Sequence, residues 1–75
     1  LGDVPLLVTA ELGRTTMHMR ELLSLAPGSI VELDRLAGSP IDVLVNGKTV
    51  ARGEVVVVDE EFGIRIVEIV DPEQR

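Results

Sequence analysis

The sequence contains no cysteine, tryptophan or tyrosine, and its only aromatic residue is Phe62. Without cysteine no disulfide can form, and His18 alone cannot supply the roughly four cysteine or histidine ligands of a structural zinc site. One phenylalanine gives nucleic acid bases no platform for stacking. Thirteen acidic and seven basic residues give a net charge of −6, which repels a phosphate backbone. We therefore expect no disulfide, no metal and no nucleic acid partner.

Long apolar runs and targeting signals are also lacking. No segment approaches the roughly 20 consecutive apolar residues that span a bilayer, and no basic segment precedes an apolar one at the N-terminus. We expect a cytoplasmic protein without direct membrane insertion. Because the chain starts at Leu1 and not at methionine, we also expect it to be the C-terminal fragment of a longer protein.

The chain is short for an independent domain. A protein of 75 residues buries only about 60% of its unfolded surface, and its core supplies about 3–5 kcal/mol. Hydrophobic residues nevertheless make up 45% of the sequence, with a mean hydropathy of +0.32. With disulfides and zinc excluded, a second subunit is the remaining way to stabilise so small a fold. The composition predicts a homodimer.

The N-terminal half has one strand pattern and one helix pattern. Apolar residues alternate from Leu6 to Leu12, which predicts a long strand, and the spacing of Met19, Leu22 and Leu23 predicts a helix. We expect this helix to run from Met19 to about Leu25 and to end before Pro27-Gly28. His18 and Glu21 have the spacing of a capping box, weakened because histidine replaces the usual hydroxyl residue.

The C-terminal half has the pattern of a β-hairpin. A short strand is predicted at 29–33 and a loop at 34–40, before strands at 41–45 and 48–58 that flank Asn46-Gly47. This dipeptide favours a type I′ turn because both positions need positive φ. Residues 59–61 form the next predicted turn, and a last strand starting at Phe62 ends before Pro72. The tail 71–75 is expected to fray, leaving order over about 3–70.

The four consecutive valines at 55–58 place apolar side chains on both faces of a strand. In the last strand we expect Ile64 and Ile66 on one face, with Val67 and Ile69 on the other. One sheet and one short helix cannot cover both faces, so a partner must bury one set, at about 1.5–3 kcal/mol per valine. Each single valine is more often a core residue than a docking residue; for the whole run we expect both uses. The expected dimer or core residues are Val58, Ile64, Ile66, Val67 and Ile69.

Catalytic and metal-binding motifs are weak throughout. Gly47-Lys48-Thr49 resembles the end of a phosphate-binding loop, but Asp42 stands where that motif needs its first glycine. No nucleophile-elbow pattern surrounds Ser24 or Ser29, either of which could pair with His18. The acidic turn at 59–61 is typical of solvated surface. We assign no catalytic, cofactor-binding or metal site.

Six segments of the chain occur in a familiar order. They are VTAELGR at 8–14, PGSIV at 27–31, LAG at 36–38, VNGK at 45–48, ARGEVVVV at 51–58 and FGIRI at 62–66. Together they resemble the C-terminal domains of FliN-type flagellar motor switch proteins, which belong to the SpoA (surface presentation of antigens) family. The resemblance extends from Asp3 to about Pro72, so residues 1–75 are expected to form a single SpoA-like domain. His18 departs from the threonine that relatives often carry.

The resemblance implies a mostly β fold: an intertwined, saddle-like homodimer that forms a shared β barrel, with one short helix per chain. It implies a structural role in the cytoplasmic C-ring of the flagellar motor switch, at the inner membrane, where rotation direction is controlled in chemotaxis and motility. Implied partners are the C-terminal domain of FliM, a phosphorylated chemotaxis response regulator, and FliH of the export apparatus. FliH would dock on a hydrophobic patch that matches Ala37, Val55, Val56 and Val57.

Three alternatives remain open at this point. The nearest is the homologous sorting-platform component of a type III secretion injectisome, although the LAG and VNGK segments favour the flagellar family. The second is the FliN-like domain of FliY, in which a phosphatase domain lies upstream. The third, from another class of protein, is a small hydrolase that uses His18, and we expect instead that the chain is not an enzyme.

Overall fold

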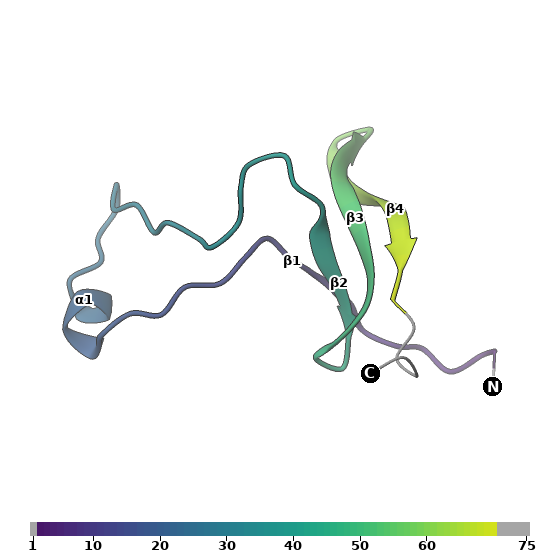
Figure 1. Ribbon diagram of the computed structural model, residues 1–75, viewed down its shortest axis with the longest axis horizontal. Helices are drawn as coiled ribbons and strands as arrows, with labels where there is room; N and C mark the ends of the chain where they lie inside the picture. Colours follow the sequence, from purple (N-terminus) through teal and green to yellow (C-terminus); the bar gives the residue numbers. More distant parts are fainter. Residues whose placement is uncertain (1, 71–75) are drawn as a thin grey trace.

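A computed structural model describes residues 2–70 and shows a four-stranded antiparallel sheet with a long arm that carries one helix (Figure 1). The strands lie side by side in chain order. The predicted tail at 71–75 lies outside the described residues. The elements are β1 (Val8–Glu11), α1 (Met19–Leu23), β2 (Ile41–Val45), β3 (Lys48–Val58) and β4 (Glu61–Ile69).

Two tight turns connect the last three strands. Asn46 and Gly47 have φ of 52° and 79° between β2 and β3, so both residues have the positive φ that a type I′ turn requires. The predicted hairpin and its strand bounds are confirmed. The turn between β3 and β4 contains Asp59, with φ of 57°, and Glu60. It is one residue shorter than predicted, because Glu61 already belongs to β4.

The N-terminal elements are shorter than their sequence patterns predict. The helix ends at Leu23, and β1 covers only the middle of the predicted strand. One half of the capping box is present, since the backbone N–H of His18 donates to the Glu21 carboxylate at 3.1 Å. The strand predicted at 29–33 is wrong. That segment lies in the arm, away from the sheet, and has no neighbouring strand with which to form a hydrogen-bond ladder (Figure 1).

The arm comprises residues 12–40 and projects from the sheet with α1 at its far end (Figure 1). Its two segments cross at the base, where the Asp34 N–H donates to the Arg14 carbonyl at 3.0 Å and the Arg14 N–H donates to the Asp34 carboxylate at 2.9 Å. A Cβ on Gly13 would lie 3.0 Å from Leu33 Cβ, so the missing side chain permits this close crossing. The Glu11 carboxylate, 2.7 Å from Arg14, raises the pKa of the Arg14 guanidinium. Hydrogen bonds thus fix the arm where it leaves the sheet.

A β-bulge in β4 changes which side chains share a face. Ile66 pairs with Gly53, and Ile69 pairs with Ala51, so Val67 is an extra residue in this part of the ladder. Because Ala51 and Gly53 lie on one face of β3, their partners Ile69 and Ile66 also share a face. The expected alternation, with Ile69 opposite Ile66, is therefore wrong at this point.

The sheet leaves most apolar side chains of the chain uncovered. Among the described residues, the buried hydrophobic side chains are those of Ile41, Val43, Leu44 and Ala51. The exposed area is 6762 Å², whereas a compact chain of this mass exposes about 4,500 Å². The radius of gyration is 15.5 Å, against about 11 Å for a compact domain of this length. This chain by itself does not bury a core of ordinary size.

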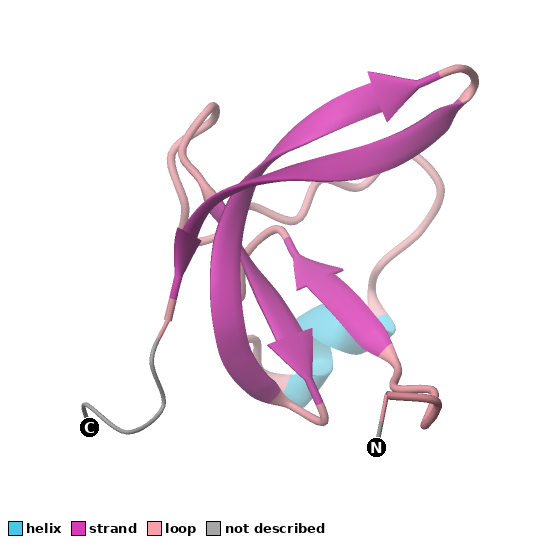
Figure 2. Ribbon diagram, turned by 90° about the vertical axis from the view of Figure 1, so that its right-hand side faces the viewer, coloured by secondary structure: helices cyan, strands magenta, loops and turns pink. Residues whose placement is uncertain are grey.

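The outer half of the β3–β4 hairpin is a two-stranded ribbon. β2 pairs with β3 only as far as Gly53, so residues 54–58 pair with β4 alone. Figure 2 shows this long, twisted hairpin extending beyond the other strands. Two strands without further packing are at best marginally stable in water. The ribbon, like the arm, therefore needs cover from outside the chain.

Gly53 lies close against β4 and gives a test of this packing. A Cβ there would lie 2.7 Å from the Arg65 carbonyl oxygen and would also overlap the Ile64 side chain. We expect Gly53→Ala to lower the free energy of unfolding by about 1–3 kcal/mol, because backbone must move to admit the methyl group. Urea unfolding measures the loss.

The matched control is Gly63→Ala, in the same hairpin. A Cβ on Gly63 would meet only side-chain methyl groups, with Val58 Cγ2 at 3.2 Å as the nearest. Those side chains can adjust, so the control is expected to unfold at a higher urea concentration than Gly53→Ala. Equal midpoints for the two variants would contradict the assigned contact.

Candidate functional site

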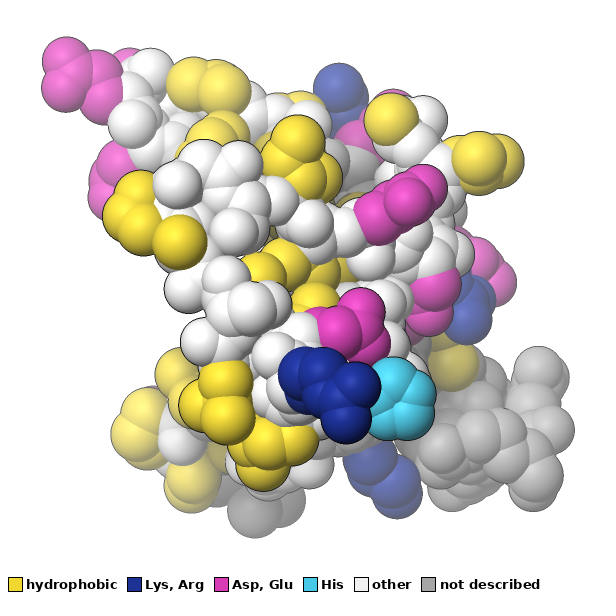
Figure 3. Space-filling model, turned by 90° about the vertical axis from the view of Figure 1, so that its left-hand side faces the viewer, with side chains coloured by type: hydrophobic (Ala, Val, Ile, Leu, Met, Phe, Trp, Pro, Cys, Tyr) yellow, Lys and Arg dark blue, Asp and Glu magenta, His cyan; other side chains and the backbone are white. Residues whose placement is uncertain are grey.

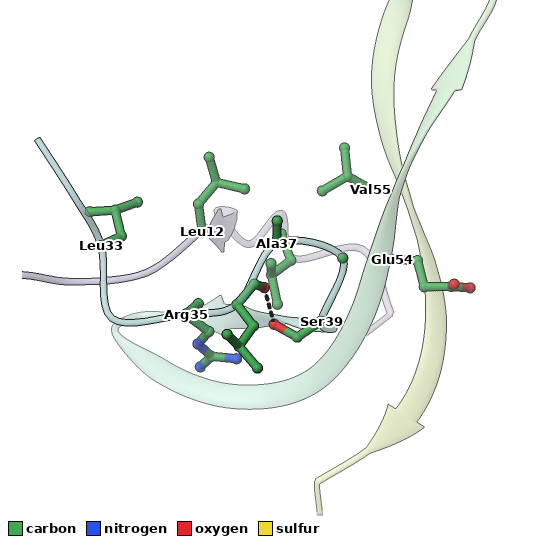
Figure 4. A pocket seen from close by; sticks show the side chains of 10 residues that line it. Leu12, Leu33, Arg35, Ala37, Ser39, Glu54 and Val55 are labelled. Carbon is green, nitrogen blue, oxygen red and sulfur yellow. Dashed lines mark hydrogen bonds between the residues drawn. The ribbon is translucent and has the colours of Figure 1, made fainter. Parts of the chain in front are cut away.

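An apolar pocket of about 400 Å³ opens between the two ends of the arm and the strands β2 and β3 (Figure 4). Its polar lining comes from Arg35, Ser39 and Glu54, and the Glu54 side chain points away from the other labelled residues. Three segments that are separate in the sequence line this apolar pocket, and the fold brings them together. The apolar lining residues are Leu12, Leu33, Leu36, Ala37, Ile41 and Val55.

A second hollow, of about 240 Å³, continues the apolar surface along the sheet. It shares Leu12, Ile41 and Val55 with the apolar pocket and adds Ala10, Phe62 and Ile64. All of its lining residues are apolar, and Phe62 is 84% exposed. This face of the sheet can bind an apolar surface.

A tight turn holds Ala37 at the rim of the apolar pocket. The Leu36 carbonyl accepts hydrogen bonds from the Ser39 N–H at 3.2 Å and from the Ser39 hydroxyl at 2.7 Å (Figure 4). Gly38 has φ of 86°, the positive value that the third residue of a type II turn needs. Ala37 is therefore the second residue of the turn, and it is exposed to solvent.

The structure divides the expected docking patch between two faces of the sheet. Val55 lines the apolar pocket together with Ala37. Val57 follows two residues later in β3 and so lies on the same face as Val55, nearer the hairpin tip. Val56 pairs with Gly63 and lies on the opposite face. The structure thus brings Ala37 and Val55 together and separates Val56 from them; the docking role of all four stays a prediction.

The residues expected at the dimer interface or in a core are not buried within the single chain. Ile64 is only partly exposed, but the other four are 48–73% exposed. Several arm residues are exposed to the same or a greater degree, Ile30 and Leu23 among them, at 92% and 78%. The four exposed interface residues are Val58, Ile66, Val67 and Ile69.

A row of charges on the other face of the sheet was not predicted from the sequence. Glu11, Asp42, Arg52 and Glu68 are successive partners across the four strands. Arg52 forms ion pairs of 3.3 Å with both Asp42 and Glu68, and Arg35 contacts Asp42 at 2.7 Å. The sequence alone does not reveal this row, because β3 and β4 each contain several charged residues and only the register shows which of them are neighbours. Asp42, Arg52 and Glu68 of this row are paired with one another, although Asp42 Oδ1, 3.3 Å from Arg52 Nε, is buried without a hydrogen bond among the described residues.

His18 lies at the surface of the arm, where Figure 3 shows the single histidine beside basic and acidic side chains. The hollow beside it is lined by His18, Arg20 and Glu21. The Ser24 hydroxyl donates to the Glu21 carbonyl at 2.8 Å, and the Ser29 hydroxyl accepts from the Ala26 N–H at 2.9 Å. Both candidate serines therefore serve local turns, and nothing assembles a nucleophile around the imidazole.

Two further features are absent from residues 2–70. Within that range, no group of three or more histidine, cysteine or acidic side chains is arranged to hold a metal ion. No helix in the same part of the chain is long and apolar enough to cross a membrane.

Comparison with known proteins identifies the family. The family described as "Type III flagellar switch regulator (C-ring) FliN C-term" matches residues 1–71. The chain belongs to this family. FliN, the flagellar motor switch protein of Pseudomonas aeruginosa, is 53% identical over 73 residues, which cover 97% of this chain and 46% of that protein. The family prediction made from the six segments is confirmed.

Two further relatives show the breadth of the FliN C-terminal family. FliY of Bacillus subtilis, a flagellar motor switch phosphatase, is 53% identical over 75 residues, which cover all of this chain and 20% of FliY. The solved C-terminal domain of HrcQb from Pseudomonas syringae pv. phaseolicola superposes with a TM-score of 0.81 at 26% identity, covering 92% of this chain and 96% of that one. The predicted mostly β, SpoA-like fold with one short helix is confirmed. The chain spans less than half the length of the FliN and FliY relatives.

Proposed function

We propose that this chain is a structural component of the bacterial flagellar motor switch complex, the C-ring, and takes part in controlling rotation direction. The carrying observation is the family match over residues 1–71, together with a FliN relative named as a flagellar motor switch protein. In this role the domain works at the cytoplasmic face of the inner membrane. It acts by holding other proteins, in keeping with an apolar binding surface.

The functional unit in this proposal is an intertwined homodimer with a shared β barrel. Two separate chains of 6762 Å² each would expose about 13,500 Å², whereas a compact body of twice the mass exposes about 7,500 Å². Closing that gap buries about 6,000 Å² in total, which is in the range of obligate dimers. The exposed arm and the β3–β4 ribbon are the segments that a second copy would cover.

The proposed docking site for the export protein FliH is the apolar pocket with the patch around it. Ala37 stands exposed on its turn beside Val55, so an apolar side chain of a partner can enter without unfolding the sheet. Val56 and Val57 extend the patch along β3, with Val56 on the opposite face. Pockets with apolar walls and a few polar groups at the rim are typical binding sites.

A calorimetric titration with the C-terminal domain of FliM from the same cell tests the proposed function. Saturable binding is expected, with a dissociation constant of at most about 1 μM, or about 8 kcal/mol, because both would belong to one ring. Failure to bind, with this domain folded and dimeric, would instead favour the sorting platform of an injectisome. The phosphorylated chemotaxis response regulator is a further proposed partner.

A catalytic role for this chain is not part of the proposal. The relative that is named a phosphatase, FliY, is covered over only 20% of its length. Neither Ser24 nor Ser29 is hydrogen-bonded to His18. In the apolar pocket, the Ser39 hydroxyl donates to the Leu36 carbonyl, and the Glu54 side chain points away from the other labelled residues (Figure 4). Should this domain be the FliN-like end of a FliY protein, the phosphatase would lie in the upstream domain.

A further inference from the structure

The turn that displays Ala37 belongs to no strand and needs a support of its own. Residues 36–39 lie near the end of the arm, in the loop that leads into β2. The two hydrogen bonds from Ser39 to the Leu36 carbonyl close the turn internally, but they do not attach it to the sheet. Some other contact must fix the direction in which Ala37 faces.

Arg35 makes that contact from the residue before the turn. One guanidinium nitrogen, Nη1, donates to the Pro40 carbonyl at 2.9 Å, and Nη2 donates to Asp42 Oδ2 at 2.7 Å. Pro40 is the residue after the turn, so the guanidinium links the two ends of the loop. Its side chain is 30% exposed and also contributes to the lining of the apolar pocket.

Asp42 attaches this link to the rigid part of the fold. It lies in β2, its side chain is 15% exposed, and its other oxygen is 3.3 Å from Arg52 Nε in β3. The contacts therefore run from β3 through Asp42 and Arg35 to the turn. A lysine could not reproduce them, because the planar guanidinium reaches two acceptors at once and a single ammonium is a point charge.

We infer that Arg35 is a positioning residue, which holds the turn at 36–39 so that Ala37 faces the apolar pocket in a form ready for docking. This inference rests on the proposed docking function. A partly exposed ion pair contributes little to global stability. Loss of Arg35 should therefore change the turn and the docking affinity much more than it changes unfolding or dimerisation.

The experiment compares Arg35→Ala with the wild-type chain by two measurements. Amide hydrogen exchange at Ser39, whose N–H binds the Leu36 carbonyl, is expected to become about tenfold faster as the turn loosens. The affinity for FliH from the same cell is expected to fall about tenfold in calorimetry. For Arg35→Lys, the Ser39 exchange rate and the affinity for FliH are both expected to lie between those of the wild type and Arg35→Ala. The lysine leaves one of the two acceptors without its donor.

Arg65→Ala is the matched control. It removes a neighbouring ion pair of 3.3 Å to Glu54, a residue that also lines the apolar pocket, but Arg65 makes no hydrogen bond to the turn. Exchange at Ser39 and the affinity for FliH should both stay within twofold of the wild type. Should Arg35→Ala not fold, Arg35→Lys and wild type provide the same comparison.

Unchanged Ser39 exchange in Arg35→Ala would overturn the inference. A rise of about tenfold in the dimer dissociation constant would also overturn it, because Arg35 would then support the dimer as much as the turn. If wild-type chain does not bind FliH, the proposed docking function fails. Exchange at Ser39 then still decides whether Arg35 positions the turn. The two failures are thus distinguishable.

Discussion

Leu22→Asp is expected to abolish the homodimer and, with it, the folded state. Leu22 is 52% exposed in the single chain and shares one side of α1 with Met19 and Leu23, which are also exposed. A five-residue helix is unstable alone in water, so its apolar side should be packed against a second copy. Replacing a buried leucine by aspartate removes about 1.5–3 kcal/mol of burial and adds a desolvated carboxylate. Burying the unpaired carboxylate costs several kcal/mol more, so the two terms together exceed the roughly 3–5 kcal/mol of so small a core.

Sedimentation equilibrium and circular dichroism at micromolar concentration check this result. If the chain were a monomer, the same substitution at an exposed site would change stability by at most about 0.5 kcal/mol. Asn46→Asp is the control: it adds the same negative charge at a turn where aspartate is accepted before glycine. A folded monomeric wild type would refute the dimer. A folded, dimeric Leu22→Asp would remove α1 from the interface.

Local patterns in the sequence were sufficient to predict that the hairpins and the helix form. Asn46-Gly47 specifies its own turn through positive φ, so the register of β2 and β3 beside the turn follows from two residues, up to the irregularity between Val43 and Leu44. The β4 strand was recognisable from its alternation, and α1 from the spacing of Met19 and its neighbours. These elements depend on contacts between residues close together in the chain, which a linear pattern records.

Long-range geometry was not predictable in the same way. The strand predicted at 29–33 is wrong because the segment lies in the arm, where no strand lies beside it and its apolar side chains stay exposed. The bulge at Val67 shifted Ile69 to the face of Ile66, and no turn residue marks it. Part of the candidate site was predictable, because the family resemblance named Ala37 and Val55. The separation of Val56 depends on strand register, and the support from Arg35 depends on loop geometry.

Ala37→Asp is expected to weaken FliH binding at least a hundredfold while the dimer stays intact. Ala37 is exposed on its turn and pairs with no strand, so the substitution costs the fold little. In a complex, the carboxylate would be buried against the apolar walls of the pocket, where the cation in the lining, Arg35, is already bound to the Pro40 carbonyl and to Asp42. Burying an unpaired charge costs several kcal/mol, and about 3 kcal/mol already corresponds to a hundredfold change in affinity.

Calorimetric titration of each variant with FliH from the same cell measures this loss, with Asn46→Asp again as the charge-matched control. The control alters a turn at the other end of β2, away from the apolar pocket, and should bind as the wild type does. Equal weakening in both variants would show that the overall negative charge, not the pocket, governs docking. Unchanged binding in Ala37→Asp would place the docking site elsewhere. The face of the sheet that carries Val56 would then be the next surface to substitute, because it is the part of the patch that the fold turns away from Ala37.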